Sequence, residues 1–322
     1  MSELKLISPM LDNFIVGDAI SDHHGVRCYP AMENETYDRF IIKVISVPAT
    51  PSKLDALLLT GAYSDKASAL DYFKEIADGV VREVDTLEKL AELEGFLAFS
   101  DCQMVPMESG NGYDIYLKST YKRTLQKHFR RHNFTHLDAL NLGLDLCAAL
   151  SVCRRSGYLY VDLKPSNVFV TDQRLFRIGD LGFLPLDSLK YASVPEKYLS
   201  EYTPPEIRDA FSELNTTMDT YAAGLILYQA YNNGALPFHD DVLPGDPLPA
   251  PMYADYEMGE IILKACAPNP DDRWQDPMQM GQAIISYMQR NGAKDIPIVP
   301  MPGTEEESAE EIPAVVLPVA EK

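Results

Sequence analysis

Residues 160–170 read YVDLKPSNVFV, and residues 178–183 read IGDLGF. The first stretch contains Asp162, Lys164 and Asn167, and the second contains Asp180, 18 residues after Asp162. Asp, Pro, Ser and Asn are common in turns, so either stretch alone is compatible with a surface loop. Four polar groups at these spacings, followed by Gly182, form a more specific pattern than a loop requires.

Together the two stretches resemble the catalytic core of the eukaryotic-type Ser/Thr protein kinases. The resemblance implies that Asp162 accepts the hydrogen bond of a substrate hydroxyl and that Lys164 binds the moving phosphate. It also implies that Asn167 and Asp180 hold the Mg²⁺ or Mn²⁺ ions that neutralise the phosphates of ATP. The expected reaction is ATP-dependent phosphoryl transfer to Ser/Thr hydroxyls of protein substrates.

The N-terminal part carries matching features. Residues 40–43, FIIK, resemble the family strand whose Lys binds the α- and β-phosphates, which makes Lys43 the third predicted catalytic residue. Without this context, a Lys at the end of an apolar strand is only an edge charge. Glu83, in a later helical stretch, is the predicted partner of Lys43, with Glu75 and Glu88 as rivals.

The predicted nucleotide lid is irregular. Gly17 and Gly25 stand eight residues apart and replace the three glycines of G-x-G-x-x-G, where backbone amides approach phosphate. The alternative is a long hairpin without a ligand. Ser119, in the stretch DIYLKST, is the predicted gatekeeper of the adenine pocket. The full predicted nucleotide-binding set is Gly17, Gly25, Lys43, Glu83, Ser119, Asn167 and Asp180.

Three motifs further along extend the resemblance over residues 12–290. Residues 202–206, YTPPE, resemble the end of the activation segment, and Asp219 resembles the buried Asp that braces the catalytic loop. Arg273 resembles the family Arg that pairs with Glu206. A buried charge persists only when it is matched, so we expect Glu206 and Arg273 to form an ion pair.

The departures from the family pattern favour a second function. Tyr160 and Val161 replace the usual His and Arg, so ordering of the activation loop by phosphorylation is not expected. Leu199 occupies the place of a Thr that bonds the catalytic Asp and Lys. The alternative is therefore a pseudokinase that acts as a nucleotide-binding or scaffolding module. A small-molecule kinase is a third possibility, less well matched by the Glu206 and Arg273 motifs.

Hydrophobic periodicity predicts a β-rich N-terminal part and a larger helical C-terminal part. The family resemblance implies that they form an α+β, bilobal fold of the protein-kinase type. We expect strands over 11–47, helices over 52–93, strands again at 96–105 and 113–118, and mainly helices after residue 125. The predicted kinase domain covers 11–292, with a small antiparallel β-lobe at 11–120 and a helical lobe at 121–292. Residues 50–72 look like a helical insertion, and 293–322 like an acidic, Pro-rich, disordered tail.

The composition indicates which binding partners and which cellular compartment to expect. The chain of 322 residues has 28 Lys+Arg and 48 Asp+Glu, a formal net charge of −20, which argues against nucleic-acid binding. Five scattered cysteines without a Cys-x-x-Cys pair predict reduced thiols in the cytoplasm. No signal peptide and no apolar run of about 20 residues is visible, so no membrane span is expected. The spacing of His128, His132 and His136 is read as a solvated face rather than a metal site.

Overall fold

The computed structural model describes residues 8–129, 134–189, 194–208, 214–238 and 242–298. Within these ranges the chain divides into two compact units. The first unit contains residues 8–85 and 98–121, and the second contains 86–97 and 122–298. The predicted lobe boundary at 120/121 is one residue from the observed change of unit at 121/122. Residues 86–97 belong to the second unit, because β5 (Phe96–Leu97) pairs with a strand there.

The first unit is built on an antiparallel sheet in the order β1-β3-β4-β7-β6. Its strands are β1 (Phe14–Val16), β2 (Ser21–His23), β3 (Val26–Glu33), β4 (Arg39–Val47), β6 (Asp101–Pro106) and β7 (Tyr113–Thr120). Strand β2 pairs with β3 at the edge. One face of the sheet is a core in which Ile42, Val44 and Tyr116 are fully buried. The short helix η1 (Pro9–Leu11) contributes Met10 to that core.

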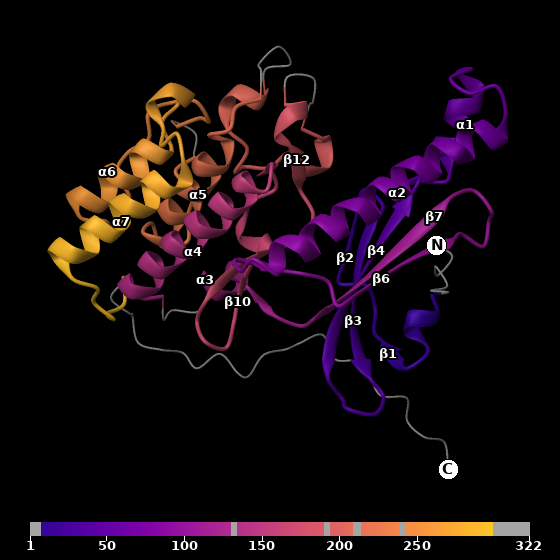
Figure 1. Cartoon of the computed structure of the whole chain (residues 1–322), viewed down its shortest axis with the longest axis horizontal. Coiled ribbons are helices and arrows are strands. Elements are labelled where there is room, and N and C mark those ends of the chain that lie inside the picture. Colours follow the sequence, from indigo (N-terminus) through magenta and orange to yellow (C-terminus); the bar gives the residue numbers. More distant parts are fainter. Residues whose placement is uncertain (1–7, 130–133, 190–193, 209–213, 239–241, 299–322) are drawn as a thin grey trace. The chain divides into compact units, whose positions relative to one another are not determined.

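Two helices lie between β4 and β6 in the sequence. They are α1 (Ser52–Leu59) and α2 (Lys66–Ala91), drawn in violet in Figure 1. Along α2, Phe73, Ala77, Val80, Val84 and Leu87 are buried at helical spacing. The prediction of helices over 52–93 is confirmed, and the segment 50–72 forms α1 and the first turns of α2.

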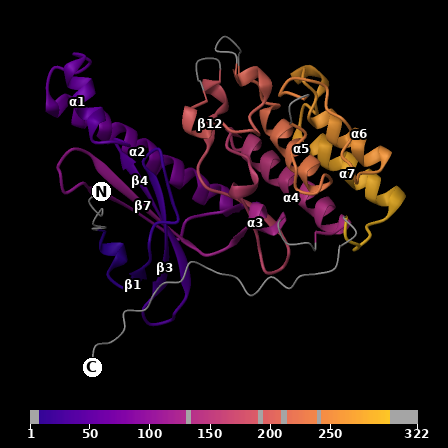
Figure 2. The same ribbon diagram turned by 180° about the vertical axis from the view of Figure 1, so that it is seen from behind.

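The second unit is mainly helical (Figures 1 and 2). Its helices are α3 (Leu125–Phe129), α4 (His136–Arg155), α5 (Met218–Ala230), α6 (Tyr256–Ala265) and α7 (Pro277–Asn291). Short strands carry the loops of interest: β8 (Arg123–Thr124), β9 (Tyr158–Tyr160), β10 (Val168–Val170), β11 (Phe176–Gly179) and β12 (Phe183–Pro185). The described residues thus form an antiparallel sheet in the first unit and mainly helices in the second, which is the α+β class that the sequence predicts.

Helix α4 begins with a capping box. The Thr135 hydroxyl accepts from the Asp138 amide at 3.1 Å, and the Asp138 carboxylate accepts from the Thr135 amide at 3.0 Å. Among the described helices, α4 alone has the length and apolar composition of a membrane span, but 61% of its apolar window is buried inside the structure. The central helix of a folded domain has the same composition, so this feature does not identify a membrane segment.

Residues 293–298 run beside the start of α4. The carbonyl of Ile296 accepts from the His136 amide at 2.9 Å, and that of Lys294 accepts from the Leu137 amide at 3.2 Å. These bonds satisfy two amides of the first turn, which have no partner within the helix. The sequence predicts a disordered tail from residue 293 onward, but residues 293–298 form backbone hydrogen bonds with the start of α4. The rest of it, residues 299–322, lies outside the described residues.

Candidate active site

The loop after β9 brings two predicted catalytic residues, Asp162 and Lys164, into direct contact with the predicted metal ligand Asn167. The Lys164 ammonium lies 2.7 Å from one oxygen of the Asp162 carboxylate. The Asn167 amide nitrogen donates to the other oxygen at 2.7 Å and to the Asp162 carbonyl at 2.9 Å. The 3-10 turn η2 (Pro165–Asn167) starts on a proline, which presets the backbone that returns Asn167 toward Asp162. Because Asp162, Lys164 and Asn167 are close in the sequence, their side chains form a local ring of polar contacts.

Asp162 is held in an electrostatically costly position. Its residue exposure is only 6%. Burial raises the pKa of its carboxyl to about 6, and the nearby negative charge of Asp180 also raises it, whereas Lys164 and Asn167 lower it. A carboxylate with two aligned hydrogen-bond partners and little water is suited to orient a hydroxyl group.

The turn that carries Asp180 packs closely on this loop. Asp180 has a φ of +72°, and its carboxylate accepts from the Leu181 amide at 2.8 Å. Gly182 has a φ of +146°, and a Cβ added there would lie 2.8 Å from the Cβ of Asp162. The Val161 amide donates to the Gly182 carbonyl at 2.8 Å. A glycine at 182 is thus needed for Asp180 to approach the catalytic loop.

Tyr160 connects the loop that carries Asp162 with the turn that carries Asp180. Its ring is buried, and its hydroxyl donates to the Gly179 carbonyl at 2.8 Å, directly before Asp180. The sequence marks Tyr160 only as a departure from the usual His. Its role as a positioning residue was missed, although a buried Tyr needs a hydrogen-bond partner and Gly179 offers one.

The remaining predicted residues lie in the first unit. Lys43 is half-buried in the middle of β4 and stands opposite Cys28 and Leu117 in the register of the sheet. Ser119 stands opposite Ile41, two residues from Lys43, so Ser119 and Lys43 share one face. This face is opposite to the core face that holds Ile42 and Val44.

The predicted lid glycines have clear local roles. Gly25 and His24, with φ of +78° and +52°, form the two-residue turn between β2 and β3. A Cβ at Gly25 would lie 2.6 Å from the Cα of Ala49. The Gly17 amide donates to the Pro30 carbonyl at 2.8 Å. Their contact with a nucleotide stays a prediction.

Glu83 lies on α2 and is half-buried, whereas its rivals Glu75 and Glu88 are exposed. This difference favours Glu83 among the three, because a carboxylate that pairs with a strand Lys must face the sheet. The pairing of Glu83 with Lys43 stays a prediction.

Comparison with known proteins fits this geometry. The protein kinase domain family matches residues 27–274. The chain belongs to this family. Similar proteins include the serine/threonine-protein kinase PknB of Mycolicibacterium smegmatis, 27% identical over 50% of this chain and 28% of the relative. PknB of Mycobacterium tuberculosis is 25% identical over 46% of this chain and 26% of the relative. The chain thus spans about a quarter of the length of these relatives.

The kinase domain contains the predicted ion pair. The Arg273 guanidinium donates to both oxygens of Glu206, at 2.7 and 2.8 Å. It also donates to the carbonyls of Ala267 and Pro268 and lies 4.6 Å from the centre of the Tyr221 ring. The Arg273 side chain is fully buried, so the prediction of a buried pair is confirmed.

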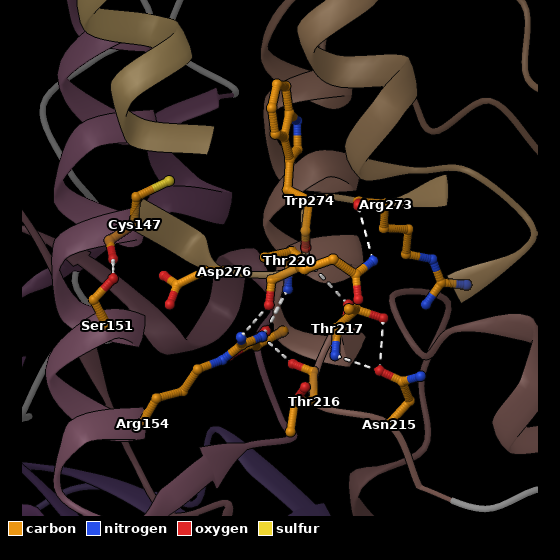
Figure 3. Close-up of polar contacts among 12 residues, drawn as sticks. Cys147, Ser151, Arg154, Asn215, Thr216, Thr217, Thr220, Arg273, Trp274 and Asp276 are labelled. Carbon is orange, nitrogen blue, oxygen red and sulfur yellow. Dashed lines mark hydrogen bonds and ion pairs between the residues drawn. The ribbon is translucent and has the colours of Figure 1, made fainter. Parts of the chain in front are cut away.

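A second buried ion pair was not predicted. Asp219, 1% exposed, accepts from the Arg154 guanidinium, with 2.9 Å between Nε and one carboxylate oxygen. Figure 3 shows Arg154 reaching from α4 toward the start of α5, where it also donates to the Thr216 carbonyl. The Gln275 carbonyl accepts from the same guanidinium at 2.8 Å. These contacts tie Asp219 to the end of α4, and its predicted role as a brace of the catalytic loop stays a prediction.

The structure also describes Val161 and Leu199, two other residues that depart from the family pattern. Val161, in the place of the usual Arg, packs against the cluster of Leu159, Val194, Tyr198 and Met218. An apolar contact thus replaces a cation that could receive a phosphate. Leu199, in the place of the usual Thr, is 46% exposed.

The donor set fits the metal that the family uses. The Asn167 amide nitrogen is fixed by Asp162, which turns its oxygen away, and that oxygen lies 3.5 Å from the Ser166 hydroxyl. One carboxylate, from Asp180, and one amide oxygen are ligand types that Mg²⁺ accepts beside water and phosphate. No group of three or more His, Cys, Asp or Glu forms a separate metal cluster in the described ranges. His132 lies outside them, and the ring of His136 is 2.8 Å from the Tyr231 hydroxyl.

Proposed function

We propose that the protein is an ATP- and Mg²⁺- or Mn²⁺-dependent kinase that phosphorylates Ser/Thr hydroxyls of protein substrates. The observation that supports this most strongly is the ring of contacts in which Lys164 and Asn167 each bond one oxygen of Asp162 at 2.7 Å. It rests further on the protein kinase domain match and on relatives that are named Ser/Thr kinases.

Each residue has a defined task in the proposed reaction. Asp162 orients the substrate hydroxyl and accepts its hydrogen bond, and Lys164 neutralises charge on the transferred group. Asn167 and Asp180 would hold the metal ions, which supply charge neutralisation for the phosphates when they are bound. Lys43 would bind the α- and β-phosphates. Because Val161 replaces the phosphate-binding Arg, the kinase should not need activation-loop phosphorylation.

A pseudokinase is the second candidate. It is supported by Leu199, which offers no hydroxyl to Asp162 and Lys164, and by Gly25, whose conformation is explained by its turn and by Ala49. A chain of this kind would bind nucleotide or a partner without efficient phosphoryl transfer.

The deciding experiment combines metal-dependent binding with turnover. ATP should raise the melting temperature more in Mg²⁺ or Mn²⁺ than in EDTA, because a ligand that binds only the folded state adds stability. Asp180→Asn should remove most of the metal-dependent part. Wild-type protein should also transfer label from γ-labelled ATP to a panel of proteins.

Two results would contradict the proposal in different ways. Normal ATP binding without label transfer above the Asp162→Asn background would leave the pseudokinase as the better account. An equal metal-dependent shift in Asp180→Asn would place the metal elsewhere. Gln279→Glu, an exposed change on α7, is a control for general effects of substitution.

A further inference from the structure

The hairpin of β10 and β11 carries both predicted metal ligands at one of its ends. Asn167 directly precedes β10, and Asp180 directly follows β11, with which β10 pairs antiparallel. The turn at the other end lies about 10 Å away, because a strand advances about 3.3 Å per residue. Paired strands transmit a displacement as one rigid element, so a shift of this turn would move both ligands together.

Arg174 fastens the turn of the hairpin to the start of α4. Its φ is +59°, and its amide closes the turn by donating to the Thr171 carbonyl at 2.9 Å. Its guanidinium donates at 2.6 Å to the carboxylate of Asp138, whose side chain is only 3% exposed and also accepts from the Thr135 amide. The 3.9 Å contact between Arg174 and Asp295 joins two half-exposed groups, so water weakens it. The contact with the buried Asp138 is therefore the stronger of the two.

The hairpin is attached to α4 at a second point, about two helical turns further along. The Phe176 amide donates to one oxygen of the Asp145 carboxylate at 2.7 Å, and the Arg177 guanidinium lies 3.6 Å from the other oxygen. Burial raises the pKa of the Asp145 carboxyl, and these two partners oppose the shift. Asp138 and Asp145 thus hold the turn and the first residues of β11 against the same helix.

Residues 293–298, which we call the C-terminal strap, reach the same place. Besides the two carbonyls that accept from the first turn of α4, the strap offers the Ile298 amide, which donates to the Phe134 carbonyl at 3.1 Å. The Phe134 ring is buried, and its centre lies 6.2 Å from the centre of the Phe176 ring in β11. The strap therefore holds Phe134, and Phe134 packs against the hairpin.

We propose that Arg174 and the C-terminal strap form a latch that holds the β10–β11 hairpin where Asn167 and Asp180 can bind the metal together. The inference rests on the proposed kinase function and adds how its metal site is positioned. Arg174 lies at the far end of the hairpin and acts through it, so Arg174 is a positioning residue for the metal. The latch also links the segment that follows residue 298 to the metal site.

The test measures how strongly Mg²⁺ promotes nucleotide binding by the full chain. A fluorescent ATP analogue is titrated in EDTA and at increasing Mg²⁺ concentrations. Arg174→Ala should raise the Mg²⁺ concentration of half-maximal effect about fivefold, since substitutions in a packed network change coupling between its ends by about 2–30-fold. Affinity in EDTA should stay unchanged. A purely structural role of Arg174 would lower the melting temperature without changing the response to Mg²⁺.

Two further variants refine the role of Arg174. Gln173→Ala is the matched control, because Gln173 is its exposed neighbour on the same turn. Arg174→Lys keeps a cation beside Asp138 but loses the planar guanidinium, so its response to Mg²⁺ should lie between those of wild type and Arg174→Ala.

The strap is tested separately. Ile298→Pro removes the amide that donates to Phe134 and should raise the half-maximal Mg²⁺ concentration about two- to threefold, the effect of losing one ordinary hydrogen bond. Asp295→Ala removes only the contact that water screens and should leave this concentration unchanged.

Equal responses to Mg²⁺ in Arg174→Ala and Gln173→Ala would overturn the role of Arg174. An unchanged response in Ile298→Pro would overturn the role of the strap. If wild type shows no response to Mg²⁺, the proposed function fails, and amide hydrogen exchange over residues 171–176 then tests the latch alone. Exchange there should be faster in Arg174→Ala than in Gln173→Ala, and equal rates would show that Arg174 does not hold the hairpin.

Discussion

The catalytic loop and the Glu206–Arg273 pair are two buried charge clusters of the same unit, and they are built in opposite ways. Arg273 meets Glu206 through two parallel hydrogen bonds, and its other donors reach backbone carbonyls. Asp162 also has a cation, Lys164, 2.7 Å from one of its carboxylate oxygens. Burial nevertheless raises the pKa of Asp162 to about 6, and the nearby charge of Asp180 adds to this shift.

This difference separates stability from reactivity. Matched charges in good geometry hold the fold, and removing one partner strands the other in a place without water. A carboxylate kept in an unfavourable place costs stability and is retained where chemistry needs it. Substitutions in the two clusters should therefore have different consequences.

The largest expected effect is on turnover. Asp162→Asn keeps the shape of the side chain but removes the charge that orients the nucleophile, so phosphoryl transfer should fall by about 10²–10⁴-fold. ATP binding with Mg²⁺ should change little, because Asp162 is not among the predicted ligands of the nucleotide. Label transfer from γ-labelled ATP and an ATP titration measure the two quantities.

The same variant should not unfold the protein. Because burial raises the pKa of Asp162, its ionised form costs stability at pH 7, and this cost disappears as the pH falls below about 6. The denaturation midpoint of Asp162→Asn at pH 7 should equal or exceed that of wild type. A large loss of stability would remove the contrast between the two clusters.

The second prediction concerns the matched pair. Arg273→Ala should lower the free energy of unfolding by about 3–5 kcal/mol, because it leaves the Glu206 carboxylate without its partner. The double variant Glu206→Ala/Arg273→Ala should lose less than the sum of the two single variants. Chemical denaturation measures all three, and strict additivity would show that the two side chains do not interact.

A third prediction extends the contrast to the predicted lid. Gly25→Ala should lower the free energy of unfolding by at least about 1–2 kcal/mol, because an alanine at a φ of +78° is strained and its Cβ meets Ala49. Gly61→Ala is the matched control, since Gly61 has a φ of +69° and nothing within 4 Å of the added Cβ. The additional loss of unfolding free energy in Gly25→Ala, compared with Gly61→Ala, measures the cost of the contact between the added Cβ and Ala49. Unchanged ATP affinity of the folded variant would count against Gly25 as a nucleotide contact.

The smallest expected effect is a pH dependence at the start of α4. Burial lowers the pKa of His136 below its usual 6.5, the charge of Asp255 opposes this shift, and Lys294 adds to it. The unfolded chain then binds a proton more readily, so stability is lost as the pH falls below about 6.5. His136→Phe keeps a ring beside Tyr231 and Tyr287 and should lose less stability than wild type between pH 7.5 and 5.5. Equal losses in thermal denaturation would show that His136 does not titrate in this range.

Much of this architecture could be predicted from residue patterns. The helical spacing of Phe73, Val80 and Leu87 predicted α2, and the run of residues 40–45 predicted β4. Thr135 is a residue type that favours the N-cap position, and it caps α4. The contacts of Asp162, Lys164 and Asn167 were predictable because they are close in the sequence and the proline at 165 restricts the path between them.

Contacts between distant residues were predicted only where the family pattern marks both partners, as for Glu206 and Arg273. Arg154 carries no such mark, and nothing near it in the sequence indicates Asp219, 65 residues away. The contact between Arg174 and Asp138 is a similar case, since the two residues lie 36 positions apart.

The sequence by itself determined the order of strands and helices, the catalytic loop and the kinase family, because periodicity and short-range spacing are local properties of the chain. The tertiary structure alone decided that Tyr160 bonds Gly179, that Arg154 neutralises Asp219 and that Arg174 bonds Asp138. The physical reason is that a buried polar group must find a partner, but its type does not say which of many distant groups will supply one.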